Sequence, residues 1–249
     1  MTQQLKWQLG TVVQIRRETP RVTTLLLDVP DWTRHFAGQH VDVRLTAEDG
    51  YQAQRSYSIA SPPEDTYLML TVERIEDGEV SLYLVDELRV DDRIELRGPI
   101  GGYFVWDARD GKDDGSPLFL VAAGSGIVPL MAMIRHRANS NNHVPTKLLY
   151  SSRSYEDIIY REELDQLSTN DCSLRVIHTL TRQQPRDWKG YERRIDRAML
   201  ADTAWPPAEK PLAFTCGPTA AVESVATYLL ELGYESERIK TERFGPTGG

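Results

Sequence analysis

The spacing of apolar residues changes once along this chain, on either side of a polar stretch at residues 108–117. Before this stretch, short runs of β-branched and aromatic residues are separated by Pro, Gly and Asp, which predicts strands joined by turns. After it, apolar strands alternate with helical segments, which predicts a parallel sheet. The chain is therefore expected to form two domains, residues 1–107 and 118–249, joined by a linker at 108–117.

The first domain is predicted to be an antiparallel β-barrel. Six short strands at regular spacing, with turn residues between them, are typical of such a barrel. One helical pattern, at residues 81–88, lies between the last two strands. The predicted strands are residues 12–16, 22–27, 40–45, 55–60, 68–72 and 91–96.

The second domain is predicted to be a doubly wound parallel sheet, because strands that alternate with helices require crossover connections. The predicted strands are residues 118–122, 147–151, 174–179, 212–215 and 239–242, and the predicted helices are residues 128–136, 156–167 and 219–232.

The net charge of −8 argues against a general nucleic-acid-binding protein, because the phosphate backbone requires a basic face. No apolar run approaches the length of a membrane span. The first residues do not resemble a signal peptide, so a cytoplasmic location is expected. Arg and Lys are concentrated at residues 182–197, and both a solvated surface and a docking or phosphate site remain open for them.

The chain has two cysteines, Cys172 and Cys216, and neither belongs to a C-x-x-C motif. Two cysteines cannot supply the four ligands of a plant-type iron–sulfur centre. No spacing typical of a zinc site is present, so no metal site is predicted. A disulfide is not expected in a reducing compartment.

A glycine-rich turn at residues 124–126 follows a predicted strand and precedes a helix. Two glycines allow a tight turn and a close approach of backbone to phosphate, and the helix N-terminus offers unsatisfied N–H groups to a pyrophosphate. Pro129 falls in the first helical turn, where its missing N–H has no cost. An ordinary glycine-rich strand–helix turn remains an equal alternative.

Residues 55–61 read Arg-Ser-Tyr-Ser-Ile-Ala-Ser and alternate as a strand does. Arg55 and Tyr57 are expected on one face, with Ser56 and Ser58 on the other. Alone, this segment fits an ordinary barrel strand. The start of the barrel's helix at residues 78–81 offers a second anion-binding N-terminus, so that Arg55 and this helix could bind one pyrophosphate while Tyr57 stacks on a flat ring.

Five motifs occur in a fixed order: R-x-Y-S at residue 55, G-x-V-S at 78, G-P-x-G at 98, G-x-G-x-x-P at 124 and C-G-P at 216. In this order the chain resembles the ferredoxin–NADP reductase superfamily, from about residue 8 to residue 244. Within that superfamily it looks similar to the reductase components of bacterial oxygenases without their iron–sulfur domain.

The resemblance implies that the barrel binds FAD, with FMN the less expected flavin. Arg55 would neutralise the pyrophosphate, Tyr57 would lie against the isoalloxazine ring, and Ser58 would hydrogen-bond near N5, the hydride acceptor. The flavin-binding residues that the resemblance implies are Arg55, Ser56, Tyr57, Ser58, Gly78, Val80 and Ser81.

The resemblance also implies that the second domain binds NAD(P)H. Ser58, Cys216 and Phe244 would border the hydride-transfer site, Cys216 as a shaping residue and not as a nucleophile. Phe244 could cover the flavin or could be a packed hydrophobe, and the role of the tail after it is open. The nucleotide-binding residues implied are Gly124, Ser125, Gly126, Pro129, Ser152, Arg153, Thr181, Arg182, Cys216, Gly217 and Pro218.

NADPH is slightly preferred over NADH as the substrate. Arg153, Arg182 and the neighbouring hydroxyls suit a 2′-phosphate, and no acidic residue ends the second strand of the sheet to bind a free ribose. An arginine at the position of Arg153 also occurs in superfamily members that use NADH, so NADH remains open.

The implied reaction takes a hydride from NAD(P)H to FAD and then passes single electrons to a separate redox protein. A ferredoxin, an oxygenase component, a haem protein and a molybdenum enzyme are all open as that partner. One alternative is a free-standing reductase of small acceptors such as free flavin, ferric complexes or quinone. Another is a non-catalytic accessory subunit that binds flavin or nucleotide. The sequence does not define an oligomeric state.

Overall fold

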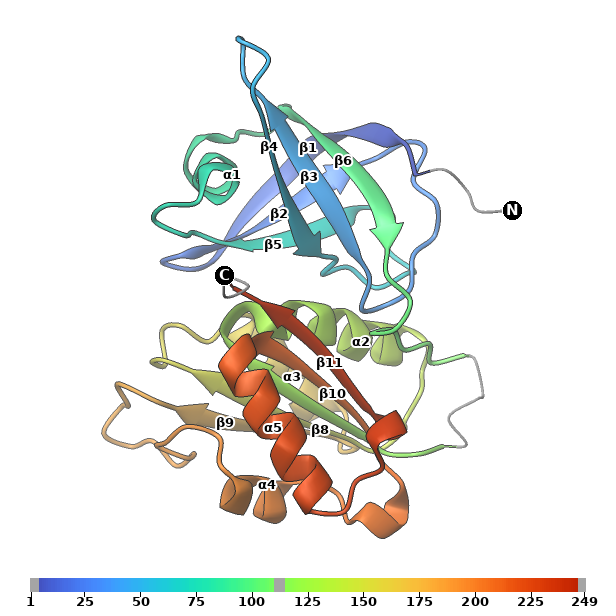
Figure 1. Ribbon diagram of the computed structural model, residues 1–249, viewed down its shortest axis with the longest axis vertical. Helices are drawn as coiled ribbons and strands as arrows, with labels where there is room; N and C mark the ends of the chain where they lie inside the picture. Colours follow the sequence, from blue (N-terminus) through green and yellow to red (C-terminus); the bar gives the residue numbers. More distant parts are fainter. Residues whose placement is uncertain (1–4, 110–114, 246–249) are drawn as a thin grey trace. The chain divides into compact units, whose positions relative to one another are not determined.

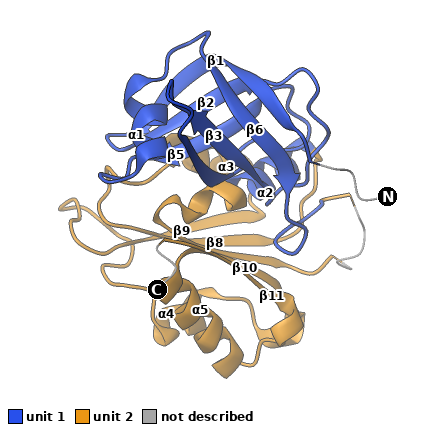
Figure 2. Ribbon diagram, turned by 45° about the horizontal axis from the view of Figure 1, so that its top comes forward, with its two compact units in different colours: residues 1–107, 131–139 blue, residues 108–130, 140–249 orange. Residues whose placement is uncertain are grey.

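The computed structural model of the protein describes residues 5–109 and 115–245 (Figure 1). Residues 110–114 of the predicted linker and residues 246–249 of the tail lie outside this description. The chain forms two compact units (Figure 2). The first contains residues 1–107 and 131–139, and the second contains residues 108–130 and 140–249. Most of helix α2 (Ile127–Asn139) therefore groups with the first unit.

The first unit contains a six-stranded antiparallel sheet in the order β4-β3-β6-β1-β2-β5. A bridge between Ile59 and Leu70 joins the segments of its two edge strands, and this confirms the predicted barrel. The strands are β1 (Trp7–Thr19), β2 (Val22–Asp28), β3 (His40–Thr46), β4 (Gln52–Ser58), β5 (Leu68–Glu73) and β6 (Arg93–Ile100).

Alternation along the strands builds the core of this barrel. Val41 and Val43 of β3 are fully buried in it, whereas the intervening Asp42 makes polar contacts. The helix of the barrel, α1 (Glu79–Leu82), begins two residues before the predicted start and continues as a π-helical turn (Tyr83–Glu87). In the first turn of this helix, the Ser81 hydroxyl donates a hydrogen bond to the Gly78 carbonyl at 3.1 Å.

The second unit contains a five-stranded sheet in the order β11-β10-β7-β8-β9, and every pairing in it is parallel. Its strands are β7 (Leu118–Ala123), β8 (Thr146–Ser152), β9 (Leu174–Leu180), β10 (Leu212–Pro218) and β11 (Ile239–Phe244). Its other elements are 3₁₀ turns at Gly124–Gly126, Pro207–Glu209 and Ser236–Arg238 and the helices α3 (Arg161–Asn170), α4 (Arg197–Thr203) and α5 (Thr219–Glu231).

Helices cover both faces of this sheet, which confirms the doubly wound arrangement. α4 and α5 pack on one face, where Met199, Val225 and Leu229 join Phe119 and Leu149 in one apolar core. α3 lies on the opposite face (Figures 1 and 2). The chain runs outward from β7 through β8 to β9, and then from β10 to β11 on the other side of β7. The order of the strands thus reverses between β7 and β10, and ligands of such sheets bind at this reversal, outside the carboxyl ends of the strands.

Two elements of the second unit differ from the sequence prediction. α3 begins at Arg161 and not at residue 156, because Tyr160 has a left-handed backbone (φ 59°) that ends any helix reaching it from the N-terminal side. α4 was not predicted. It is capped by Asp196, whose side chain accepts a hydrogen bond from the Met199 amide.

Acidification should destabilise the fold through three histidines, one buried and two half-buried. Burial lowers the pKa of His35, His40 and His178 below the ordinary value of 6.5. The unfolded chain therefore binds more protons than the folded chain near and below that pH, so the free energy of unfolding should fall as the pH is lowered from 7 to 5. Urea unfolding at pH 5, 6 and 7 measures this fall, and His178→Gln should reduce it. His143→Gln is the control, since the side chain of His143 is 75% exposed. A free energy that is constant over this range would contradict the prediction.

Candidate functional site

Strand β4 presents Arg55 and Tyr57 on one face and Ser56 on the other. Its register with β3 pairs Arg55 with Val43, Ser56 with Asp42, and Tyr57 with Val41. Tyr57 is half-buried against the barrel core, and burial raises its pKa well above the usual value, so the phenol stays neutral. The Arg55 side chain is exposed and makes no ion pair among the described residues, and its Nη1 donates only to the Gln54 carbonyl, at 2.6 Å. Its guanidinium is therefore available to an anion.

The side chain of Ser56 is bound within the protein. Its hydroxyl donates to Asp42 at 2.7 Å, and Arg97 donates to the other oxygen of that carboxylate at 2.6 Å. Burial works to raise the pKa of Asp42, but these hydrogen bonds outweigh it and hold the pKa below its usual value. A contact of Ser56 with a cofactor, as predicted, would therefore use its backbone.

The start of α1 has a backbone cradle at Gly78. A Cβ at this position would lie 2.5 Å from the Ser81 Oγ. That hydroxyl also accepts from the Ile75 amide at 3.2 Å, so Ser81 fixes the turn that enters the helix. The first N–H groups of a helix, here those near Val80 and Ser81, have no partner within it. The segment thus fits the predicted contact with a phosphate through its backbone.

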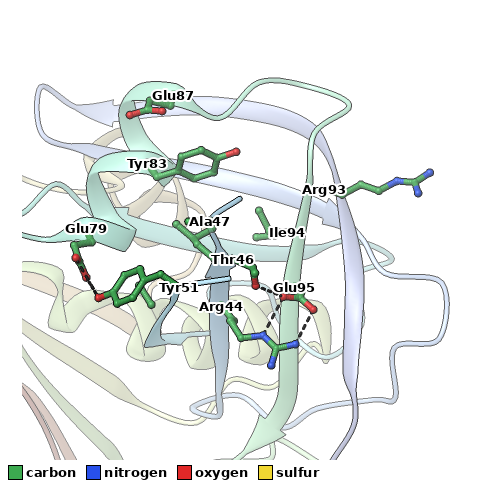
Figure 3. A pocket seen from close by; sticks show the side chains of 12 residues that line it. Arg44, Thr46, Ala47, Tyr51, Glu79, Tyr83, Glu87, Arg93, Ile94 and Glu95 are labelled. Atoms are coloured by element: carbon green, nitrogen blue, oxygen red, sulfur yellow. Dashed lines mark hydrogen bonds and ion pairs between the residues drawn. The ribbon is translucent and has the colours of Figure 1, made fainter. Parts of the chain in front are cut away.

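A hollow of about 500 Å³ lies between α1 and the β3–β4 hairpin, and Arg55, Tyr57 and Ser58 do not line it (Figure 3). Much of its polar lining is already paired. Tyr51 donates to Glu79 at 3.1 Å, and Arg44 pairs with Glu95 at 2.7 Å. We assign no cofactor to this hollow.

In the second unit, the glycine turn after β7 packs directly on the end of β10. A Cβ on Gly126 would lie 2.1 Å from the carbonyl oxygen of Cys216 and 2.8 Å from the amide nitrogen of Gly217. Gly124 has a left-handed backbone (φ 56°), which favours glycine. The predicted segments at 124–126 and 216–218 therefore meet at the point where the strand order reverses. Pro129 lies in the first turn of α2, as expected.

Cys216 is buried, and burial raises the pKa of its thiol well above the ordinary value. The thiol stays protonated at neutral pH, which suits a shaping residue better than a nucleophile. Phe244 ends β11 beside Pro218 and is 37% exposed, so it is not a fully packed hydrophobe.

The ends of β8 and β9 bring Ser152, Arg153, Thr181 and Arg182 together. The Thr181 amide donates to the Ser152 carbonyl at 3.0 Å, and the Arg182 amide donates to the Arg153 carbonyl at 2.9 Å. Both arginine side chains are exposed. The Ser152 hydroxyl is buried and has no hydrogen-bond partner in the described part of the chain. A buried polar atom without a protein partner is normally satisfied by a water or a ligand.

The basic stretch at 182–197 is partly exposed. Arg193 pairs with Asp196 inside the stretch, and Arg197 pairs with Glu231 of α5. Within residues 5–109 and 115–245, no group of His, Cys, Asp and Glu could hold a metal ion. Over the same ranges, no helix has both the length and the apolar character to cross a membrane.

Sequence reasoning missed two residues of α2, Arg135 and His136, which contact the segment that follows β4. The available signal was their position in the segment Ile127–Asn139, where charged side chains directly follow an unbroken apolar run. Sequence reasoning also missed Asp42, which holds the Ser56 hydroxyl.

Comparisons with known proteins identify the family of each of the two domains. Residues 8–105 match the family described as the oxidoreductase FAD-binding domain, and residues 120–227 match the oxidoreductase NAD-binding domain. The first match contains β4 and the start of α1. The second contains the glycine turn, Ser152 and Cys216.

The chain is 34% identical over 243 residues to the glycine betaine monooxygenase reductase subunit of Pseudomonas aeruginosa, which covers 94% of the chain and 63% of that subunit. It is 26% identical to the ferredoxin–NAD(P)(+) reductase component of a naphthalene 1,2-dioxygenase system from Pseudomonas putida, covering 96% of the chain and 69% of that protein. Among solved structures, the flavohem-like FAD/NAD-binding domain of a nitric oxide dioxygenase from Vibrio cholerae superposes with a TM-score of 0.83 at 25% identity, covering 96% and 99% of the two chains.

Proposed function

We propose that this chain, with one domain of the type that binds FAD and one of the type that binds a pyridine nucleotide, is an FAD-dependent NAD(P)H reductase of the ferredoxin–NADP reductase superfamily. It would pass single electrons to a separate redox protein. The chain spans 63% of the length of its Pseudomonas aeruginosa relative. The activity of the whole protein is therefore a proposal and is not taken over from that relative. A cytoplasmic location is part of the proposal. The two cysteines of the chain form no disulfide, which is compatible with a reducing compartment.

The observation that carries the proposal is the packing of Gly126 on the backbone of Cys216 and Gly217. This contact joins two segments at the reversal of strand order, where parallel sheets bind dinucleotides. Backbone in this tight turn is open to a pyrophosphate, and the α2 N-terminus favours negative charge there.

The barrel residues fit a flavin. Bound FAD would supply the redox chemistry, taking up two electrons together and releasing them singly. Arg55 would pair with its pyrophosphate, because the guanidinium is exposed and has no carboxylate partner among the described residues. Tyr57 would offer a neutral aromatic surface to the ring, and Ser58 would donate or accept a hydrogen bond at the ring edge. The N–H groups at Val80 and Ser81 would bind phosphate oxygens.

The second unit would bind and orient the nicotinamide nucleotide. Gly124 and Gly126 would hold the pyrophosphate, while Cys216 and Pro218 would shape the border at the nicotinamide. Phe244 would lie on the same side as Pro218, since the two residues end adjacent strands. None of these residues has to move a proton, because hydride transfer depends on proximity and orientation.

The electron acceptor is proposed to be a separate protein of the kind that its relatives serve. The relatives are named as a reductase subunit and a reductase component of oxygenase systems, which support an oxygenase component or a ferredoxin as the partner of this chain. A haem protein or a molybdenum enzyme would receive electrons by the same chemistry.

We propose NADPH as the preferred substrate, because Arg153 and Arg182 lie side by side at the ends of β8 and β9. Replacing both by alanine should raise KM for NADPH by roughly 10- to 100-fold, the range of one or two lost charge-assisted hydrogen bonds, and should change KM for NADH less than about twofold. Steady-state kinetics with both nucleotides measure this difference. Arg186→Ala, another exposed cation of the same stretch, is the matched control. Equal changes in KM for both nucleotides would show that these arginines do not bind a 2′-phosphate.

Cofactor release and electron counting test the proposed function. Mass spectrometry of the ligand released by heat should identify FAD. With ferricyanide as a one-electron acceptor, each NAD(P)H oxidised should reduce two ferricyanide ions. A protein that binds no flavin even after reconstitution, or that oxidises neither nucleotide, would overturn the proposal. Rapid turnover with free flavin or quinone would instead identify a free-standing reductase.

A further inference from the structure

Helix α2 ends in three buried residues that can carry positive charge. Its apolar part, which includes Leu130 and Ile134, is followed by Arg135 at 7% exposure, His136 at 0% and Arg137 at 1%. Such side chains are rarely buried without specific partners. Arg135 contacts Ala60, and His136 contacts Glu64 and Asp107, all in the barrel unit, to which residues 131–139 also belong.

Arg135 binds the backbone directly after the flavin strand. Its Nη1 donates to the Ala60 carbonyl at 2.6 Å, two residues beyond Ser58. His136 holds the next part of the same segment, because its Nδ1 lies 3.0 Å from a Glu64 carboxylate oxygen while its Nε2 lies 3.0 Å from Asp107. Both ring nitrogens are therefore engaged by carboxylates.

Other hydrogen bonds fix the remaining groups of this segment. The Ile59 amide donates to the Gln39 carbonyl at 2.9 Å, and the Ala60 amide donates to Met69 at 2.8 Å. The Ser61 carbonyl lies 3.0 Å from the Nε2 of His35. Residues 59–61 are fully buried. Because residues 59, 60 and 61 each make a hydrogen bond through the backbone, the segment that follows β4 has little conformational freedom. Among these hydrogen bonds, the one from Arg135 to the Ala60 carbonyl comes from a charged side chain.

We propose that Arg135 and His136 are positioning residues that fix the backbone beyond Ser58 and thereby set how β4 presents Tyr57 and Ser58 to the flavin. The expected effect on flavin reduction rests on the proposed function as an FAD-dependent reductase. Neither side chain acts on the reacting atoms. Their effect is on orientation, and misplacement of a reacting group by about 1 Å can slow a transfer step about 100-fold.

Single-turnover reduction by NAD(P)H tests this on the FAD-loaded protein. Arg135→Gln should keep stoichiometric flavin, shift its visible circular dichroism spectrum and slow bleaching by about tenfold or more. The dissociation constant for the nucleotide should change less than about twofold, because Arg135 lies nine residues beyond Gly126 and is assigned no contact with the nucleotide. Arg135→Lys, which keeps a positively charged donor toward the Ala60 carbonyl, should recover part of the rate. Asn139→Ala, at the exposed end of the same helix, is the control.

Hydrogen exchange in the flavin-free protein is the second measurement. Arg135→Gln and His136→Gln should accelerate exchange of the Ile59 and Ala60 amides by at least about tenfold over the Asn139→Ala protein. If Arg135→Gln does not fold, His136→Gln carries both measurements. A bleaching rate within twofold of wild type together with unchanged exchange overturns the proposal. If the wild-type flavin is not bleached at all, the proposed function fails, and the exchange data still decide whether these residues fix the segment.

Discussion

Arg55→Ala should weaken flavin binding by about 10- to 150-fold, the most direct loss expected from any change in the barrel. The exposed guanidinium makes no ion pair among the described residues, so a flavin pyrophosphate would be its principal anionic partner. A hydrogen bond to a charged group contributes about 1.5–3 kcal/mol, which corresponds to this range in Kd. Titration of the flavin-free protein with FAD, followed by quenching of flavin fluorescence, gives the constant.

Gln54→Ala is the matched control for Arg55→Ala. Gln54 is the exposed neighbour of Arg55 on β4, and strand alternation turns its side chain to the other face. Thermal unfolding of both flavin-free variants should match wild type, since neither side chain is part of the barrel core. If Arg55→Ala binds FAD as tightly as Gln54→Ala does, the phosphate partner has been wrongly assigned.

Gly126→Ala should lower kcat/KM for NAD(P)H by at least about 100-fold while FAD stays bound. The new Cβ would lie 2.1 Å from the Cys216 carbonyl oxygen, so either the glycine turn or the end of β10 must move. Overpacking of this kind costs about 1–3 kcal/mol or more, and here the displaced atoms are those proposed to hold the nucleotide. Stopped-flow reduction at a series of nucleotide concentrations separates weaker binding from slower transfer.

Gly102→Ala is the control for a simple glycine-to-alanine exchange. No heavy atom lies within 4 Å of the Cβ position at Gly102. This variant should reduce its flavin at the wild-type rate. A Gly126→Ala protein with near-normal nucleotide kinetics would show that the turn after β7 is a structural strand–helix connection and not a pyrophosphate site.

Local patterns were sufficient to predict the architecture. The alternation of β3 buries Val41 and Val43 and leaves Asp42 for polar contacts. Short runs rich in β-branched and aromatic residues, separated by Pro, Gly and Asp, were sufficient to predict the six barrel strands. Strand–helix alternation likewise predicted the parallel sheet, because successive parallel strands must be joined by crossover connections. The glycine turn at 124–126 and the C-G-P segment at 216–218 were both expected to bind the nucleotide. The structure places the two segments in contact.

Features that depend on contacts distant in sequence could not be predicted. The start of α3 depends on the left-handed backbone of Tyr160, a buried tyrosine with no local signal for that conformation. The Ser56 hydroxyl is bound by Asp42, which only the strand register reveals. From the local sequence, Arg135 would be expected at the solvent-facing end of an apolar helix. In the structure it donates to the Ala60 carbonyl, 75 residues earlier in the chain.

Anaerobic mixing of the FAD-loaded protein with NADH and with NADPH, followed by visible absorbance, tests the central claim most directly. We predict that the visible absorption band of the flavin disappears with at least one nucleotide, faster with NADPH, and returns on addition of a one-electron acceptor. A flavin that is tightly bound yet keeps its colour in an excess of both nucleotides would contradict the claim that this chain is a reductase.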